Sequence, residues 1–392
     1  MKEIRVALIG TGVISRQHME RYAKIPNAKV VAACDIDKQK LEAWGEKYQI
    51  QDLYTDFREM LKRDDIDAVD VCLHNNLHVP MALEILKAGK HCYLEKPMAA
   101  SYADAKLLYD FAQKCDKELS VHLDLMFLPQ SRVARQMVEN GELGKVYHAR
   151  SVGLRRRMRP GLDVPPPMFS RDFISKKWAG HGALYDMGVY HISQLLYILG
   201  TPKLERVTGR TYQEVLYNGK PACESGMEVE ELGVGFATYE NGLTLDIIES
   251  WAIHMDEFGP AFLVGSKGGL KLTQENVFGQ NRPNLKFLTT KGTADVDIDL
   301  KTGSNAMTEG FLDPTARYLD NDQACWIAYL SGELKERYDT AYLALQTMLV
   351  SEGLFLSSEL GREIHADEIE ALSKSTAIHV QETEWGTFHY DF

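Results

Sequence analysis

No apolar run in this sequence of 392 residues approaches the length needed to cross a membrane, and residues 1–4 lead into a strand pattern without an apolar leader. We therefore expect a cytoplasmic protein with no membrane partner. Basic patches interleaved with aromatic residues are also lacking, and the net charge is −12, so nucleic acid is not an expected partner. The six cysteines lack Cys-x-x-Cys spacing, which favours reduced core thiols.

Internal repeats and low-complexity linkers are absent too, so the domain boundary has to be sought in a change of pattern, which falls near residues 124–129. A chain of this length with 45% apolar residues can bury two substantial cores. We predict two domains, residues 1–124 and residues 125–392. The scattered histidines have no third acidic or cysteine ligand close in sequence, so no metal is expected.

What the sequence does contain is a glycine-rich turn directly after its first strand pattern. Residues 4–9 read as a short buried strand that breaks at Gly10 and continues into a helical pattern. Gly10 permits a tight turn, Gly12 lets the backbone approach a pyrophosphate, and Ser15 is small enough to replace the usual third glycine or alanine. This turn predicts dinucleotide binding by Gly10, Gly12, Val13 and Ile14.

The second strand pattern, residues 29–35, ends in Asp35, where a Rossmann unit places the carboxylate that binds the adenosine ribose. A carboxylate there accepts hydrogen bonds from the ribose of NAD and repels the extra phosphate of NADP. No arginine follows at once, although Lys38 and Lys40 could meet a phosphate. We therefore expect NAD, with NADP disfavoured.

Further strand patterns at residues 68–73 and 119–124 alternate with helical ones, which is typical of a parallel α/β sheet. Ligands bind beyond the carboxyl ends of such strands. Glu95 and Lys96 stand at one such end, before Pro97, and the Lys96–Pro97 bond is of the kind that can be cis. The remaining residues expected along the same crevice are Leu73, His74, Asn75, His78 and Asp124.

Several motifs in this order resemble the glucose-fructose oxidoreductase, inositol dehydrogenase and MocA (Gfo/Idh/MocA) family. They are Gly10-Thr11-Gly12, Asn75-Asn76-Leu77-His78, Ala88-Gly89-Lys90-His91, Glu95-Lys96-Pro97, Gly141–Val146, Gly180–Gly188 and Ser266–Leu270. The resemblance implies a Rossmann domain followed by an α+β domain with a large, mostly antiparallel, open-faced sheet. It also implies that Glu95 contacts the nicotinamide ribose, that Lys96 works beside the substrate hydroxyl, and that copies associate through the open sheet face.

The pattern of the second half agrees with an antiparallel sheet, because no helix long enough for parallel crossovers separates its strands. Strand patterns occur at residues 145–152, 228–239, 243–253, 261–264 and 270–273, after a helical pattern at residues 130–140. A helical pattern returns at residues 341–358, and we expect it to pack back on the first domain. The last thirty residues show no usable periodicity.

The second domain carries its candidate chemistry in residues 178–191. On a continuous helix Asp186 and Tyr190 share a face, whereas His191 points about 140° away from Asp186. Many relatives have histidine where this chain has Tyr190. Either Tyr190 takes that catalytic role, which helical geometry favours, or the helix is offset and His191 serves.

Hydride transfer from a secondary alcohol requires a group that takes the hydroxyl proton. Lys96 can do this if burial and cofactor charge lower its pKa. Asp186 would orient a second substrate hydroxyl, with Tyr190 or His191 sharing the proton. Candidate substrate-binding residues are Arg156, Arg157, Trp178 and His181. The arginines would clamp an anion or pair with the acidic surface of the chain itself.

The paired arginines ahead of the glycine motif resemble family members that oxidise pyranosides, including glycoside 3-dehydrogenases. This resemblance favours oxidation of a sugar or glycoside ring hydroxyl, at C3 of a glycoside. Three alternatives stay open: a cyclitol or anhydrosugar dehydrogenase, a redox-neutral NAD-dependent glycosidase, and a non-catalytic sensor of nicotinamide nucleotides.

Overall fold

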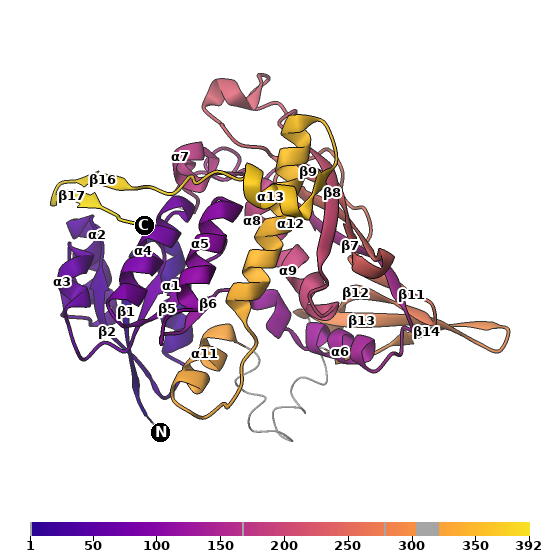
Figure 1. Cartoon of the computed structure of the whole chain (residues 1–392), viewed down its shortest axis with the longest axis horizontal. Helices are drawn as coiled ribbons and strands as arrows, with labels where there is room; N and C mark the ends of the chain where they lie inside the picture. Colours follow the sequence, from indigo (N-terminus) through magenta and orange to yellow (C-terminus); the bar gives the residue numbers. More distant parts are fainter. Residues whose placement is uncertain (1, 167, 278–279, 303–320) are drawn as a thin grey trace.

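The computed structural model describes residues 2–166, 168–277, 280–302 and 321–392 (Figure 1). Its first domain is a sheet of six parallel strands in the order β3-β2-β1-β4-β5-β6. The strands are β1 (Ile4–Ile9), β2 (Ala28–Cys34), β3 (Leu53–Tyr54), β4 (Ala68–Val71), β5 (His91–Leu94) and β6 (Leu119–Val121). The helices are α1 (Val13–Tyr22), α2 (Lys38–Tyr48), α3 (Phe57–Leu61), α4 (Asn75–Lys87) and α5 (Tyr102–Ala112). The predicted Rossmann domain is confirmed.

Gly10 shows why this sheet needs glycine where β1 turns into α1. Its φ is +95°, and an added Cβ would lie 2.3 Å from the carbonyl oxygen of Cys72 at the end of β4. Any other residue would therefore be strained and would push β1 and β4 apart. The close approach of the two strand ends positions the edge where ligands of such sheets bind.

The second domain holds a mixed sheet of nine strands among the described residues, in the order β14-β13-β12-β11-β7-β10-β9-β8-β15. All neighbouring pairs are antiparallel except β7 and β10, so the predicted mostly antiparallel sheet is confirmed. The strands are β7 (Val146–Leu154), β8 (Leu204–Tyr212), β9 (Leu232–Tyr239), β10 (Thr244–Ser250), β11 (Phe262–Gly265), β12 (Gly268–Val277), β13 (Gln280–Lys291), β14 (Ala294–Asp299) and β15 (Ile364–His365).

Two features of this sheet differ from the prediction. The strand expected from residue 228 begins at Leu232, because the Glu230 carboxylate instead accepts hydrogen bonds from the backbone N–H groups of Gly182 and Leu184. Strands β8, β13 and β14 were not anticipated. Polar residues interrupt the apolar alternation of β8 and β13, whereas β14 (Ala-Asp-Val-Asp-Ile-Asp) does alternate apolar and polar residues and was overlooked.

The remaining helices pack on the large sheet or against helices of the Rossmann domain. They are α6 (Pro129–Glu139), α7 (Lys176–Ala179), α8 (Ala183–Asp186), α9 (Gly188–Ile198), α11 (Asp322–Leu330), α12 (Thr340–Leu360) and α13 (Ala366–Leu372). The central helix α12 contacts α5 of the first domain as well as α9 and β8 of the second (Figure 1). No helix in the described part of the chain is both long and apolar enough to span a bilayer.

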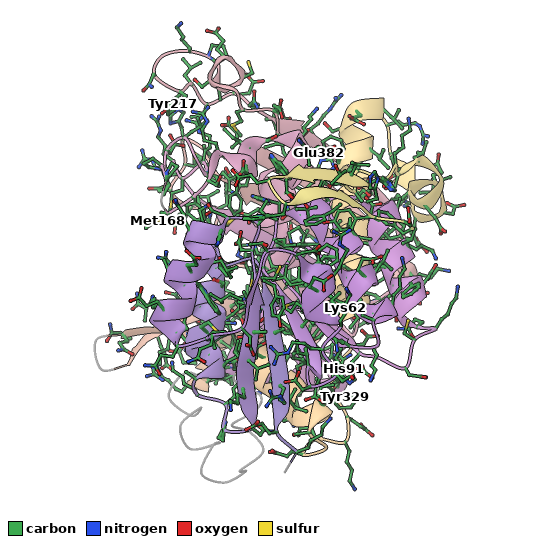
Figure 2. All side chains as sticks on the ribbon, turned by 90° about the vertical axis from the view of Figure 1, so that its left-hand side faces the viewer. Lys62, His91, Met168, Tyr217, Tyr329 and Glu382 are labelled. Carbon is green, nitrogen blue, oxygen red and sulfur yellow. The ribbon has the colours of Figure 1, made fainter. Side chains whose placement is uncertain are left out.

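The last residues form a hairpin of β16 (Val380–Thr383) and β17 (Gly386–His389) that lies against the Rossmann domain rather than the large sheet (Figure 1). Figure 2 shows Glu382 of this hairpin at one end of that domain and His91, the first residue of β5, at the other. The hairpin therefore lies toward the carboxyl ends of the parallel strands.

Candidate active site

The edge formed by the first two strands is arranged for a dinucleotide. Asp35 follows β2, and its Oδ2 accepts hydrogen bonds from the backbone N–H of Thr11 at 2.7 Å and from Thr11 Oγ1 at 2.8 Å. A Cβ added to Gly12 would meet nothing within 4 Å, and α1 begins without a side-chain cap. Open space above Gly12 and the N–H groups of the first helical turn fit the pyrophosphate of NAD, and Asp35 remains the residue predicted to bind its adenosine ribose.

Lys96 and Asp186, ninety positions apart, meet where the two domains join. Lys96 Nζ lies 2.7 Å from Asp186 Oδ1, and the ammonium stands 4.5 Å from the centre of the Tyr190 ring. The indole N–H of Trp251, a fully buried residue just after β10, donates to Asp186 Oδ2 at 2.9 Å. The peptide bond between Lys96 and Pro97 is cis. Three of the predicted catalytic residues thus form one cluster.

Each charged group of this cluster shifts the pKa of its neighbours. Burial alone would lower the pKa of Lys96, but Asp186, Tyr190 and Glu95 raise it above its usual value. Burial opposes ionisation of Asp186, yet Lys96 and Trp251 lower the pKa of that carboxyl. Burial raises the pKa of Tyr190, against the opposing effect of Lys96. Lys96 is predicted to take the hydroxyl proton if burial and cofactor charge lower its pKa, and within the protein itself the contact with Asp186 acts in the opposite direction.

His191 belongs to a different contact. The helix expected through Asp186 and Tyr190 is divided at Met187 into α8 and α9, so the argument from one continuous helix does not hold. His191 Nδ1 lies 2.8 Å from Oε2 of the buried Glu249, and Glu249, against burial, raises the pKa of the imidazole. An added Cβ at Gly153 would lie 2.1 Å from Glu249 Oε2, so glycine is needed for this approach.

Glu95 is fixed from within the Rossmann domain. Its Oε1 lies 2.9 Å from Nε2 of His18 on α1, and its Oε2 accepts the backbone N–H of Lys96 at 2.9 Å. Burial opposes ionisation, but His122, His18 and Lys96 lower the pKa of Glu95 to about 2. Sequence reasoning missed His18, because a lone histidine within a helix gives no local signal of a buried acidic partner.

Other predicted edge residues connect the domains or brace the loops. His74 Nε2 lies 3.1 Å from Asp172 and its ring lies 5.0 Å from that of Trp178. The Asn75 side chain donates to the carbonyl of Ala179 at 3.0 Å.

His78 is buried at the same edge, and its Nδ1 donates to the carbonyl of Pro97 at 2.7 Å, so it joins the loops after β4 and β5. Asp124 forms a two-pronged pair with Arg21 of α1, at 2.6 and 3.0 Å. Leu73 is half-buried beside the tight turn of Gly10.

The residues predicted to bind the substrate differ in their exposure and in their contacts. Arg156 and Arg157 are exposed, and Arg157 lies 3.5 Å from Asp163 on the same loop. Their neighbour Arg155 acts electrostatically on both Asp186 and His191, and its buried Nη1 has no hydrogen-bond partner among the described residues. Sequence reasoning did not single out Arg155, because the direction in which each side chain of the run points depends on how the loop leaves β7, and substrate binding by Arg156 and Arg157 stays a prediction.

The structure places His181, a predicted substrate residue, between aromatic side chains. Its buried ring packs against Tyr185, with centres 4.2 Å apart, and against Phe355 of α12 at 4.1 Å. Burial, with Lys176 nearby, lowers the pKa of His181 to about 3. A neutral imidazole between two aromatic rings is a core contact.

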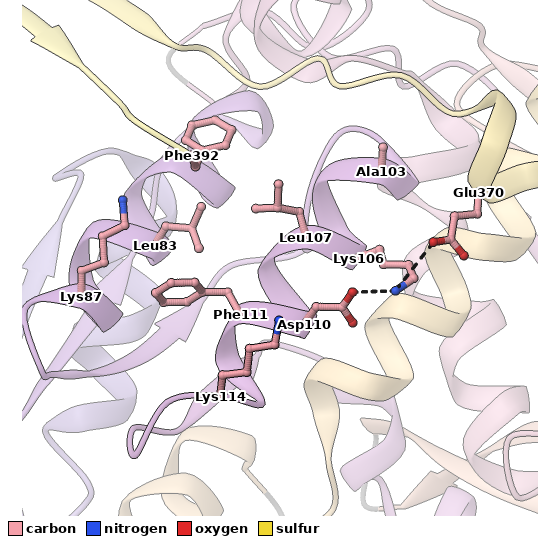
Figure 3. Close-up of a pocket in the computed structure, with 10 residues that line it drawn as sticks. All are labelled: Leu83, Lys87, Ala103, Lys106, Leu107, Asp110, Phe111, Lys114, Glu370 and Phe392. Carbon is pink, nitrogen blue, oxygen red and sulfur yellow. Dashed lines mark hydrogen bonds and ion pairs between the residues drawn. The ribbon is translucent and has the colours of Figure 1, made fainter.

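A groove of about 580 Å³ lies elsewhere, on the outer side of α4 and α5 (Figure 3). Lys106 on its wall is paired with Asp110 at 2.6 Å and with Glu370 at 3.8 Å. None of the residues that line it contacts Lys96, so this groove lies apart from the cluster around Lys96.

Comparison with known proteins decides the family. Residues 4–123 match the oxidoreductase family with an NAD-binding Rossmann fold known as Gfo/Idh/MocA, and residues 131–271 match its C-terminal domain. The chain belongs to the Gfo/Idh/MocA family. The resemblance seen in the sequence is confirmed, as are NAD as cofactor and the class of NAD-dependent oxidoreductase.

Relatives within the Gfo/Idh/MocA family include D-glucoside 3-dehydrogenase of Escherichia coli, 29% identical over 309 residues, covering 76% of this chain and 85% of that one. D-apiose dehydrogenase of Paraburkholderia graminis is 24% identical over 391 residues, covering 95% and 92%. A solved structure of levoglucosan dehydrogenase with NADH and L-sorbose has the same fold, with a TM-score of 0.75 at 18% identity, covering 93% and 99%.

Proposed function

We propose that this protein oxidises a secondary ring hydroxyl of a sugar or glycoside, at C3 of a glycoside, with NAD as hydride acceptor. The observation that carries the proposal is the cluster of Lys96, Asp186 and Tyr190 beside the predicted nicotinamide edge. The relationship to D-glucoside 3-dehydrogenase supports the substrate and the position. The carboxylate of Asp35 supports NAD rather than NADP as the cofactor, because it would repel the 2′-phosphate of NADP.

When bound, NAD⁺ accepts a hydride at its nicotinamide ring. Lys96 Nζ is held by Asp186 and is the group placed to exchange a proton with the substrate oxygen. As an ammonium it donates that proton to a ketone, and as a neutral amine it takes the proton from an alcohol. Tyr190 lies against the ammonium and shares the site of the reacting oxygen.

The substrate needs fixed hydroxyl contacts as well as a proton acceptor. Asp186 Oδ2 is oriented by Trp251, and Arg155, which acts electrostatically on Asp186, has a buried Nη1 with no hydrogen-bond partner among the described residues. A polyhydroxylated ring satisfies such a set of donors and acceptors better than a simple alcohol does. The residues of the cluster therefore favour a sugar over an unsubstituted secondary alcohol.

The proposal is tested by NADH formation from matched substrates: methyl glucosides, free glucose, myo-inositol and levoglucosan. We expect the glucosides to be oxidised, and trapping of the ketone with borodeuteride to place deuterium at C3. Preferential oxidation of inositol or levoglucosan would identify the cyclitol or anhydrosugar alternative. Cleavage of the glycosidic bond without net NADH would identify a glycosidase.

A matched variant controls for the sensor alternative. Lys96→Met keeps the length of the side chain but removes its proton-exchanging amine. It should bind NAD⁺ with nearly unchanged Kd while its turnover falls below a tenth of the wild-type rate. A sensor would show no turnover in either protein.

We also propose that copies of the chain associate through the open face of the large sheet. Phe236 of β9 is 41% exposed there and stacks on His148 of β7. Light scattering of the wild type and of Phe236→Lys tests this, since a dimer or larger assembly should dissociate in the variant. A wild-type monomer would contradict it.

A further inference from the structure

The C-terminal hairpin is fixed to the Rossmann domain by aromatic packing. Phe388 and Tyr390 are each 2% exposed, and their rings lie 5.5 and 5.9 Å from that of Phe57 at the start of α3. The guanidinium of Arg58 stands 4.8 Å from the centre of the Phe388 ring. The hairpin is therefore built into this domain, and its tip has a defined place.

That tip carries Trp385, whose indole N–H donates to the backbone carbonyl of Ile36 at 2.8 Å. Its own backbone N–H is held by Thr383 Oγ1 at 3.1 Å, which fixes the turn. Trp385 and Ile36 are each 42% exposed although both are large and apolar. Ile36 directly follows Asp35, the residue placed to hold the adenosine ribose of NAD.

Adenine has to lie next to the ribose that carries it, just beyond the carboxyl end of β2. It is flat and apolar on both faces, and aromatic side chains stack on such bases. An anchored, half-exposed indole beside Asp35 supplies that kind of surface, and the hydrogen bond to Ile36 fixes it relative to the strand end. We propose that Trp385, which lies near the C-terminus of the chain, forms the outer wall of the adenine site.

This inference depends on NAD binding and not on which sugar is oxidised. It therefore separates binding of the adenosine half from binding of the nicotinamide half. Residues that act only through the stability of the fold would weaken both halves together, whereas an adenine wall acts on one.

Calorimetric titration of the full chain with ADP-ribose and with nicotinamide mononucleotide measures the two halves. Trp385→Ala should weaken ADP-ribose and NAD⁺ about tenfold to a hundredfold, the usual range for loss of one stacking ring, and leave the mononucleotide unchanged. Trp385→Phe keeps a ring and should stay within about threefold of wild type. Leu360→Ala, at a side chain 50% exposed on α12, is the matched surface control.

Unchanged ADP-ribose affinity in Trp385→Ala, or an equal loss for the mononucleotide, would overturn the inference. A fluorescence measurement guards against misfolding of the alanine variant. AMP should quench the tryptophan emission of the wild type, and Trp385→Phe should lose most of that quenching. Quenching of the same size in both proteins would place the adenine away from Trp385.

Discussion

His18 Nε2 lies 2.9 Å from Glu95 Oε1, so a histidine of the first helix holds the acidic residue next to the proposed catalytic lysine. The other ring nitrogen lies 2.8 Å from Asp70. Burial opposes protonation, but the acidic neighbours raise the pKa of His18 well above its usual value. The imidazolium therefore balances buried Asp70 and, together with His122 and Lys96, buried Glu95.

His122 extends this arrangement and should make stability depend on pH. Burial opposes its protonation, but Asp322, Glu95 and Asp124 raise the pKa of His122 to about 10. Because the pKa of His122 is raised above its unfolded value of about 6.5, the protonated imidazole stabilises the fold fully below pH 6.5. This stabilisation is lost as the pH rises toward 10. Denaturant titrations should show the free energy of unfolding falling by a few kcal/mol over this window.

The variant His122→Gln should flatten that decline, whatever its effect on absolute stability. Exposed His254 serves as the matched control, and His254→Gln should keep the wild-type slope. Equal slopes in all three proteins would contradict the assignment to His122.

Asp186 should set the pH at which Lys96 works. Because Asp186 raises the pKa of Lys96, oxidation should accelerate toward alkaline pH as the neutral amine becomes populated. Asp186→Asn removes the anion, so the limb of the profile should move to lower pH by about one unit or more, even though the maximal rate falls. Steady-state kcat across pH measures the shift, and an unmoved limb would assign the titration to another group.

Tyr190 and His191 should differ in what they contribute. Tyr190→Phe should lower kcat by roughly 10²-fold, the scale of an acid-base partner, since the ring lies against the Lys96 ammonium. His191→Asn should act mainly on KM or stability, because its imidazole is paired with Glu249. The opposite ranking in kcat would give the proton-sharing role to His191.

Adjacent arginines offer a matched test of substrate contact. Arg155→Gln should raise KM for the sugar about tenfold or more without changing the Kd of NAD⁺, because it removes unpaired donors near Asp186. The exposed Arg156→Gln should leave both constants within about twofold. Equal effects of the two variants on KM would show that Arg155 does not contact the substrate.

Asp35 should select the cofactor. We expect kcat/KM to favour NAD over NADP at least about tenfold, or roughly 1.4 kcal/mol, because a carboxylate repels a 2′-phosphate. Asp35→Asn keeps the shape of the side chain and removes its charge, so the preference should narrow. Wild-type rates that are equal with both cofactors would refute this role.

The architecture and the residues of local motifs could be predicted from the amino-acid sequence. The tight turn at Gly10 and the acidic end of the next strand at Asp35 belong to one strand-turn-helix unit, and a local pattern is enough to find such a unit. Lys96 and Asp186 were predicted from short motifs together with the resemblance to the family, which supplied their catalytic roles.

Which of these groups meet, and in which charge state, depends on contacts between residues remote in the sequence. The Tyr190 ring lies against Lys96, whereas Glu249, from a distant strand, engages His191. The pKa of Lys96 rises because an aspartate ninety residues away lies against it. The segment around Trp385 shows no periodicity in the sequence. Trp385 lies beside Asp35 because Phe388 and Tyr390 of the same hairpin pack on Phe57. Side-chain direction and charge depend on neighbours remote in sequence, which local pattern does not encode.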